Sequence, residues 1–235
     1  MAGLRVRSLL VTGANRGIGL GLVQHFLKMP NPPQWVFAGC RDPKGQRAKV
    51  RLGWEAVAVL RDRDPASIQV AATTVREHVG GSGLNLLINN AGIAKITLLE
   101  NETPEDMTET YTTNTVGPLL MGQAFLPLLK KAAQGSPGSG MSCSKAAIVN
   151  MSSIVTSYRC SKAALNMLAK CQSLAYKEHG IFCVALHPGW VQTDMGSSPP
   201  VTVDDSVKGM LKVLSSLSEK DTGTFLDWEG KVVPW

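Results

Sequence analysis

Short apolar segments alternate with segments of helical periodicity along the whole chain, and this order limits the folds that the chain can adopt. The segments typical of buried strands are residues 8–13, 35–39, 55–60, 84–90, 145–153, 181–189 and 222–227. The segments with helical spacing of apolar residues are 17–28, 66–79, 103–131, 158–180 and 202–217. Strands that alternate with helices form a parallel sheet covered by helices on both faces, because each crossover returns over one face. The sequence therefore predicts a doubly wound α/β fold in one domain, residues 1–235.

Composition and charge argue against several classes of protein. No window approaches about 18 uninterrupted apolar residues, so we expect no membrane association. The net charge is +6, but the basic residues are scattered and form no run of five or more, which argues against nucleic acid as a partner. The five cysteines form no CxxC pair and the four histidines have no metal-ligand spacing. We therefore expect a reducing, cytoplasmic location and no metal.

A glycine-rich turn, TGANRGIG, joins the first expected strand to the first expected helix. Gly13, Gly17 and Gly19 allow a tight turn there and let a pyrophosphate approach the backbone, and the helix N-terminus adds free N–H groups and a positive dipole. The spacing Gly-x-x-x-Gly-x-Gly differs from GxGxxG, and such a turn can also be purely structural. Its place between strand and helix favours a dinucleotide site, which would also include the turn residues Asn15, Arg16 and Ile18.

The end of the second expected strand indicates which dinucleotide is bound. Enzymes that use NAD usually have an acidic residue here, which binds the ribose hydroxyls. In FAGCRDP that position is Cys40, followed by Arg41, and Arg16 lies in the glycine turn. Two arginines suit a 2′-phosphate, whereas Asp42 is evidence against it but falls beyond the strand. We expect NADP(H) rather than NAD; the alternative for Arg41 is a solvated loop charge.

Six motifs, in order, resemble those of the short-chain dehydrogenase/reductase family. They are TGANRGIG, NNAG at 89–92, Asn114 in YTTNTVG, NMSS at 150–153, YRCSK at 158–162 and HPGWVQT at 187–193. The resemblance extends over essentially the whole chain. The nearest branch is that of the cytosolic carbonyl reductases of the sniffer and C-factor-like type, whose ends look like the C-terminal FLDWEGKVVPW. This resemblance implies a Rossmann-type fold and NADPH-dependent reduction of an aldehyde, ketone or quinone.

The resemblance also implies the roles of single residues. Tyr158 would protonate the carbonyl oxygen as hydride arrives, and Lys162, one helical turn later, would favour the tyrosinate and bind the nicotinamide ribose. Ser153 would hydrogen-bond the substrate oxygen, and Asn114 would anchor a water molecule in the proton relay. The cofactor would be contacted further by Asn90, Ala91 and Gly92 on its adenosine side and by Pro188, Gly189, Val191 and Thr193 at the nicotinamide.

Two segments are shorter than is usual in the family. Ser153 and Tyr158 are only five positions apart, so the loop that lines the substrate pocket is largely absent. Five residues can span roughly 17 Å, so the two side chains can meet if Tyr158 begins its helix, and a slip of one position would give the role to Ser152. In residues 46–67, Arg61 stands where the family has an acid that meets the adenine, with Asp62 beside it as a candidate contact. We expect a wide pocket and slow turnover, since loosely held catalytic groups lose rate steeply.

Two functions of different classes are consistent with these residues. The first is an NADPH-dependent carbonyl reductase with Tyr158 as the acid and a small carbonyl compound as substrate. The second is a non-catalytic nucleotide-binding or interaction protein that keeps the fold after shortening of the Ser153–Tyr158 segment. We also expect a homodimer, because relatives commonly pair through two long helices and LLMGQAFLPLL has more apolar positions than one helix face needs.

Overall fold

A seven-stranded parallel sheet forms the centre of the computed structural model, which describes residues 4–41, 57–60, 63–95, 98–136, 140–154, 159–193 and 200–234. The strand order across the sheet is β3-β2-β1-β4-β5-β6-β7, and every neighbouring pair runs parallel. The strands are β1 (Ser8–Thr12), β2 (Trp35–Cys40), β3 (Val57–Val59), β4 (Leu86–Asn89), β5 (Ala147–Met151), β6 (Phe182–His187) and β7 (Phe225–Asp227).

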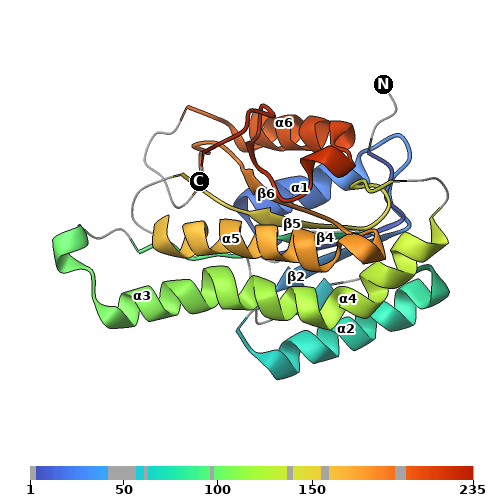
Figure 1. The fold of residues 1–235 in the computed structure, drawn as a ribbon, viewed down its shortest axis with the longest axis horizontal. Helices are drawn as coiled ribbons and strands as arrows, with labels where there is room; N and C mark the ends of the chain where they lie inside the picture. Colours follow the sequence, from blue (N-terminus) through green and yellow to red (C-terminus); the bar gives the residue numbers. More distant parts are fainter. Residues whose placement is uncertain are drawn as a thin grey trace.

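Helices cover both faces of this sheet (Figure 1). The helices α1 (Gly17–Leu27) and α6 (Val203–Ser216) lie on one face, and α2 (Pro65–Val79), α4 (Gly117–Gly135) and α5 (Arg159–Ala175) lie on the other. The helix α3 (Pro104–Tyr111) leads into α4 through a π-helical segment, Thr112–Val116. The described 3₁₀ helices are Gly80–Ser82, Leu99–Asn101, Lys177–His179 and Glu219–Asp221. The predicted doubly wound α/β fold is thereby confirmed.

The two faces of the sheet have separate hydrophobic cores, because successive residues of a strand point to opposite faces. Leu9 and Val11 of β1 belong to the core that includes Phe26 of α1. Leu10, which lies between them in the strand, belongs to the opposite core with Phe125 of α4. Burying one large apolar side chain is worth about 1.5–3 kcal/mol, so the register of the strands, and with it the position of the loops that follow them, is strongly determined.

Helix starts follow the sequence closely, whereas two helices differ from expectation further along. The predicted helix over 158–180 ends as α5 at Ala175, and a 3₁₀ turn then leads to Gly180, whose φ is 69°. The helix expected over 103–131 contains the π-helical segment, for which the apolar pattern has no signature. Three helices begin at a side-chain oxygen that accepts a first-turn backbone N–H: Asp64 for α2, Thr103 for α3 and Thr202 for α6.

The strand order determines where a ligand can bind. After β1 the chain adds β2 and β3 on one side, and then returns to place β4 on the other side of β1. At such a reversal the loops after the two neighbouring strands diverge and leave a crevice at the carboxyl ends of the strands. In this protein the crevice lies between the loop after β1 and the loop after β4. Among the described helices, none combines the length and the apolar character that crossing a membrane requires.

Candidate active site

A cavity of about 590 Å³ opens at this edge of the sheet. Its size lies within the range of small-molecule and cofactor sites. The loops after β1, β4 and β6 contribute to its walls, together with the ends of β2 and β5, the N-terminus of α2, the π-helical segment and α5. The described residues that line it are Gly13, Asn15, Arg16, Gly17, Ile18, Cys40, Arg41, Arg63, Asp64, Asn90, Ala91, Gly92, Ile93, Thr113, Met151, Ser152, Lys162, Pro188, Gln192 and Thr193.

The turn between β1 and α1 requires glycine for two physical reasons. Gly13 and Gly17 have φ of 62° and 51°, values that residues with a side chain rarely adopt. A Cβ at Gly19 would lie 2.3 Å from the carbonyl oxygen of Gly13 and 2.5 Å from Nδ2 of Asn90, closer than van der Waals contact allows. Arg16 occupies the N-cap position, and the first residues of α1 line the cavity. The N-terminus of this helix is therefore a site at which an anion would be stabilised.

The loop after β4 is bound to the end of β1. Thr12 accepts, through Oγ1, hydrogen bonds from the backbone N–H groups of Asn90 and Ala91 at 3.0 and 2.9 Å. The side-chain Nδ2 of Asn90 donates in return to the carbonyl oxygen of Thr12 at 2.9 Å. These bonds hold two walls of the crevice at a defined separation. They also show that Asn90 has a structural role besides its place in the lining.

Asn114, in the π-helical segment, holds the same loop from its other side. Its Oδ1 accepts the backbone N–H of Ile93 and its Nδ2 donates to the carbonyl oxygen of Ile93, both at 2.9 Å. Nδ2 also donates to Oγ of Ser161 in α5 at 3.1 Å. Asn114 is completely buried, and these bonds connect the loop after β4, the π-helical segment and α5. The water relay that the family implies for Asn114 stays a prediction.

Lys162 and Ser152 meet at the carboxyl end of β5. Lys162 is only 6% exposed, and its Nζ donates to the carbonyl oxygen of Met151 at 2.7 Å. Burial lowers the pKa of this lysine from 10.5 to about 8. Ser152 donates from Oγ to the carbonyl oxygen of Lys162 at 3.3 Å and lines the cavity. Ser153 is not among the described lining residues, and both serines are buried, at 3% and 8% exposed. Both serines therefore stay candidates for a contact with a ligand: Ser152 lines the cavity, but its Oγ already donates to Lys162, and Ser153 is the more exposed of the two.

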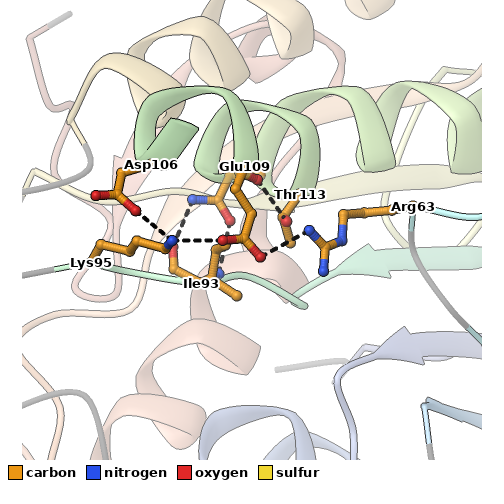
Figure 2. A network of polar contacts seen from close by, with 7 residues as sticks. Arg63, Ile93, Lys95, Asp106, Glu109 and Thr113 are labelled. Atoms are coloured by element: carbon orange, nitrogen blue, oxygen red, sulfur yellow. Dashed lines mark hydrogen bonds and ion pairs between the residues drawn. The ribbon is translucent and has the colours of Figure 1, made fainter. Parts of the chain in front are cut away.

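Four charged side chains connect Arg63, which lines the cavity, with the loop after β4 and with α3 (Figure 2). Glu109 of α3 accepts a hydrogen bond from Nη1 of Arg63 at 3.1 Å and pairs through its other oxygen with Nζ of Lys95 at 2.6 Å. Lys95 also donates to Oδ1 of Asp106 at 2.5 Å. Hydrogen bonds from Lys95 lower the pKa of both carboxyl groups, and the bonds to Asp106 and Glu109 raise the pKa of Lys95. Lys95, Asp106 and Glu109 are therefore charged at neutral pH.

The cavity brings together most of the residues that the sequence assigns to the site. Among the described residues, five others belong to the same loops and helices but do not line it: Gly19, Asn114, Ser153, Gly189 and Val191. Gly189, with φ of 88°, packs against the ring of Trp228. The remaining two assigned residues, Tyr158 and Asp62, lie outside the described residues, as do Asp42 and Arg61.

Eight of the described lining residues are absent from the sequence-based site, and two of these, Cys40 and Ser152, were discussed there without being assigned to it. The other six fall into two groups. Four of them are neighbours of motif residues and could have been found by that signal: Ile93 after NNAG, Thr113 before Asn114, Met151 in NMSS and Gln192 in HPGWVQT. The other two, Arg63 and Asp64, follow the short strand β3 and lie outside the six motifs. Their place in the cavity follows from the strand order, which the sequence does not state.

Comparison with known proteins agrees with this geometry. The family model for short chain dehydrogenases matches residues 7–201. The crystal structure of an NADPH-bound carbonyl reductase from chicken fatty liver is 61% identical in sequence, with a TM-score of 0.94 and coverage of 99% of this chain and 100% of that chain. The carbonyl reductase Sniffer of D. melanogaster is 36% identical, with a TM-score of 0.94 and coverage of 98% and 100%. The C-signal protein of Myxococcus xanthus is 40% identical over 155 residues, which are 65% of this chain and 93% of that protein.

The matched region contains the elements that build the cavity. It runs from just before β1 to the residue before the N-cap of α6, and so includes the glycine turn, the loop after β4, Asn114 and Lys162. The resemblance recognised in the six sequence motifs is confirmed, and so is the likeness to carbonyl reductases of the sniffer and C-factor type. This chain belongs to the short-chain dehydrogenase family.

Proposed function

We propose that this protein uses NADPH to reduce the carbonyl group of a small molecule. One observation carries the proposal: a single cavity joins the glycine turn after β1 to Lys162 and Ser152 at the end of β5. A phosphate-binding turn and a set of proton-donating groups thus border the same space. Family membership supports oxidoreductase chemistry, and the chicken and fly proteins, which are named carbonyl reductases, support the substrate class.

The cavity fits a dinucleotide that has a phosphate on its adenosine ribose. A Cβ at Gly13 would lie 3.0 Å from Cα of Ala91, so a side chain at this turn would crowd the crevice into which the pyrophosphate has to enter. Arg16 and Arg41 both line the cavity, and Cys40 occupies the position where an NAD enzyme usually has an acid. Guanidinium groups bind phosphate strongly because they donate several hydrogen bonds in one plane. We therefore infer NADPH rather than NADH.

The residues of this chain have to hold the carbonyl oxygen and give it a proton, while bound NADPH supplies the hydride. In the proposed mechanism Tyr158 is the acid, and Ser152 or Ser153 donates a hydrogen bond to the same oxygen. A free tyrosine has a pKa of about 10, which is too high for efficient proton transfer near neutral pH. Lys162 follows Tyr158 by four positions, and its positive charge would favour the tyrosinate.

The protonation of Lys162 would respond to what fills the cavity. Its pKa of about 8 results from burial, and its Nζ lies at the carboxyl end of β5. An anionic cofactor placed in the same cavity would favour the charged form of the lysine. Cofactor binding and the activation of Tyr158 would then be coupled, because the cofactor favours the charged form of Lys162 and that charge favours the tyrosinate.

The alternative function, nucleotide binding without catalysis, is supported by the short distance between Ser153 and Tyr158 in the sequence. Only four residues separate them, which leaves little chain to enclose a substrate. The two functions share the cofactor site and differ only in turnover. An experiment that measures binding and turnover separately therefore distinguishes them.

The test measures NADPH oxidation with a panel of quinones, aromatic aldehydes and dicarbonyl compounds. We expect turnover with at least one class, and its loss in Tyr158→Phe with NADPH affinity nearly unchanged, because only the proton donor is removed. Tyr111→Phe, at a tyrosine of α3 that is 47% exposed, is the matched control and should keep full activity. Unchanged turnover in Tyr158→Phe would refute the mechanism. NADPH binding by the unmodified protein without turnover of any compound would support the non-catalytic function.

A further inference from the structure

The strand order assigns the two ends of the cavity to the two ends of a dinucleotide. The glycine turn follows β1, in the middle of the sheet, and Lys162 and Ser152 lie at the end of β5 on one side of it. Arg41 follows β2, and Arg63 comes after β3, on the other side. A dinucleotide has its pyrophosphate in the middle and its reactive ring at one end. If the pyrophosphate occupies the glycine turn, as the proposed function requires, the adenosine lies at the β2–β3 end.

Arg63 is the lining residue of this end that a defined set of ion pairs holds in place. Its Nη1 donates to Glu109 at 3.1 Å, and Glu109 is itself held by Lys95 at 2.6 Å, which in turn is held by Asp106 (Figure 2). The side chain of Arg63 is 42% exposed, so without this pairing it would sample many conformations. The pairing reduces this freedom and connects the residue before α2 to α3.

An arginine paired with a carboxylate offers a ligand a different surface from an arginine that serves a phosphate. The negative charge of Glu109 offsets the positive charge of the guanidinium, so Arg63 attracts a further anion less strongly. Its planar guanidinium remains able to stack on an aromatic ring, a contact in which arginine is favoured over lysine. The aromatic group that a dinucleotide presents at this end of the cavity is the purine.

We propose that Arg63 binds the adenine ring of the cofactor by stacking and that Glu109 is a positioning residue, which fixes the plane of the guanidinium. This inference rests on the proposed function. It assigns different tasks to the arginines of the cavity: Arg16 and Arg41 distinguish NADPH from NADH, whereas Arg63 contributes equally to the binding of both. β3 lies farther from the glycine turn than β2 does, which is consistent with a contact to the outermost part of the ligand.

The test compares equilibrium binding of NADPH and of NADH, by calorimetry, across a set of variants with unchanged thermal midpoints. We expect Arg63→Ala to raise both dissociation constants by the same factor, roughly threefold to tenfold, because a stacking contact with the purine is lost. Arg63→Lys keeps the positive charge but lacks the planar guanidinium, and it should behave like Arg63→Ala. Arg41→Ala should weaken NADPH alone. Arg76→Ala, at an exposed residue in the last turn of α2, is the control and should change neither constant.

The positioning role of Glu109 is tested by a double-mutant cycle. Glu109→Gln should weaken both dinucleotides, and adding it to Arg63→Ala should cause no further loss, because it acts through the arginine. Additive losses would refute this role. A loss confined to NADPH, full rescue by Arg63→Lys, or unchanged binding in Arg63→Ala would each refute the purine contact while leaving the proposed function intact. If the unmodified protein bound neither dinucleotide, the proposed function and this inference would both be wrong.

Discussion

At the scale of single residues, Gly19 is the glycine whose replacement has the clearest consequence. A Cβ there would lie 2.3 Å from the carbonyl oxygen of Gly13, and that oxygen belongs to backbone that cannot swing away. We expect Gly19→Ala to lower the free energy of unfolding by roughly 2–3 kcal/mol, as overpacking of a close contact does, and to weaken NADPH binding because the turn has to shift. Gly81→Ala is the control, since no atom beyond the neighbouring residues of its own turn lies within 4 Å of its Cβ position. Equal stability of the two variants in chemical denaturation would contradict this account.

Lys162 gives a second prediction at this scale, a dependence of stability on pH. Burial lowers its pKa from 10.5 to about 8, so between these values the unfolded chain binds a proton that the folded chain does not. The free energy of unfolding contributed by this group therefore rises as pH increases from about 8 to about 10.5, by up to about 3 kcal/mol. Below about pH 8 both states are protonated, and the cost of burying the charge is fully present.

Comparison with Lys162→Met in the absence of cofactor isolates this contribution. The buried thiols of Cys143 and Cys183 have raised pKa values, because burial disfavours their thiolates, and they give the opposite slope at high pH in both proteins. The free energy of unfolding of the unmodified protein should therefore rise relative to that of Lys162→Met as pH increases from 7 to 10. A difference that stays constant in urea denaturation over this range would show that the lysine does not titrate near pH 8.

The residues of the site differ in how well sequence alone predicts them. Gly13 and Gly17 are recognisable because positive φ values and a close backbone approach restrict these positions to glycine, and the sequence order puts them in a turn. The choice between Ser152 and Ser153 is not predictable, because a shift of one residue at a strand end reverses the direction of a side chain. The ion pair of Arg63 is not predictable either, since its partner Glu109 is 46 positions away in the sequence.

At the scale of elements, the π-helical segment Thr112–Val116, which joins α3 to α4, contains the residue that binds the loop after β4. Such segments are rare and frequently lie at functional sites. Here the segment carries Asn114, whose amide group satisfies both backbone groups of Ile93 and contacts Ser161. The sequence predicts a helix over this region correctly. It does not predict the change of helical pitch, because the tertiary contacts of one buried amide, and not apolar periodicity, accompany it.

Replacement of this amide tests the connection between the elements. We expect Asn114→Ala to lower the free energy of unfolding by roughly 2–3 kcal/mol, because polar backbone groups of Ile93 would lose their buried partner. Thr108→Ala, at an exposed position of α3, is the control and should cost less than about 0.5 kcal/mol. Hydrogen exchange of the Ile93 amide should also become faster in Asn114→Ala alone. Protection of that amide equal to that in the unmodified protein would show that the contact does not hold the loop.

At the scale of the whole molecule, the order of strands and helices is predictable from sequence because each apolar segment alternates with a helical one. Right-handed crossovers and burial of both sheet faces leave few other arrangements for such a chain. The end positions of the elements are less predictable, as α5 shows, because the last turns are decided by local contacts. The same holds for the site: the fold determines where the loops after the strands lie, so their positions are predictable, whereas the contacts between these loops are not.

The association of two copies is the remaining prediction for the whole molecule. Four large apolar side chains on α3 and α5 are 47–68% exposed: Met107, Tyr111, Met167 and Leu174. The helices α3 and α5 contact each other and run side by side in Figure 1, so these residues are carried by one helical layer. Exposed apolar side chains gathered on one layer are typical of an interface, and a twofold axis across it would pair the same helices of both copies. We therefore predict a homodimer formed through this layer.

Light scattering at micromolar concentration tests this prediction directly. The unmodified protein should have the mass of two chains, and the double variant Met167→Glu/Leu174→Glu should have the mass of one, because the twofold axis would bring like charges together in a desolvated contact. Val70→Glu is the matched control: Val70 is 65% exposed but lies on α2 and not on α3 or α5, and its replacement should leave the dimer intact. A monomeric mass for the unmodified protein, or a dimer that survives the double variant, would show that this layer is not the interface. If the dimer is confirmed, the contact would also stabilise α3, whose Glu109 holds Arg63 in place.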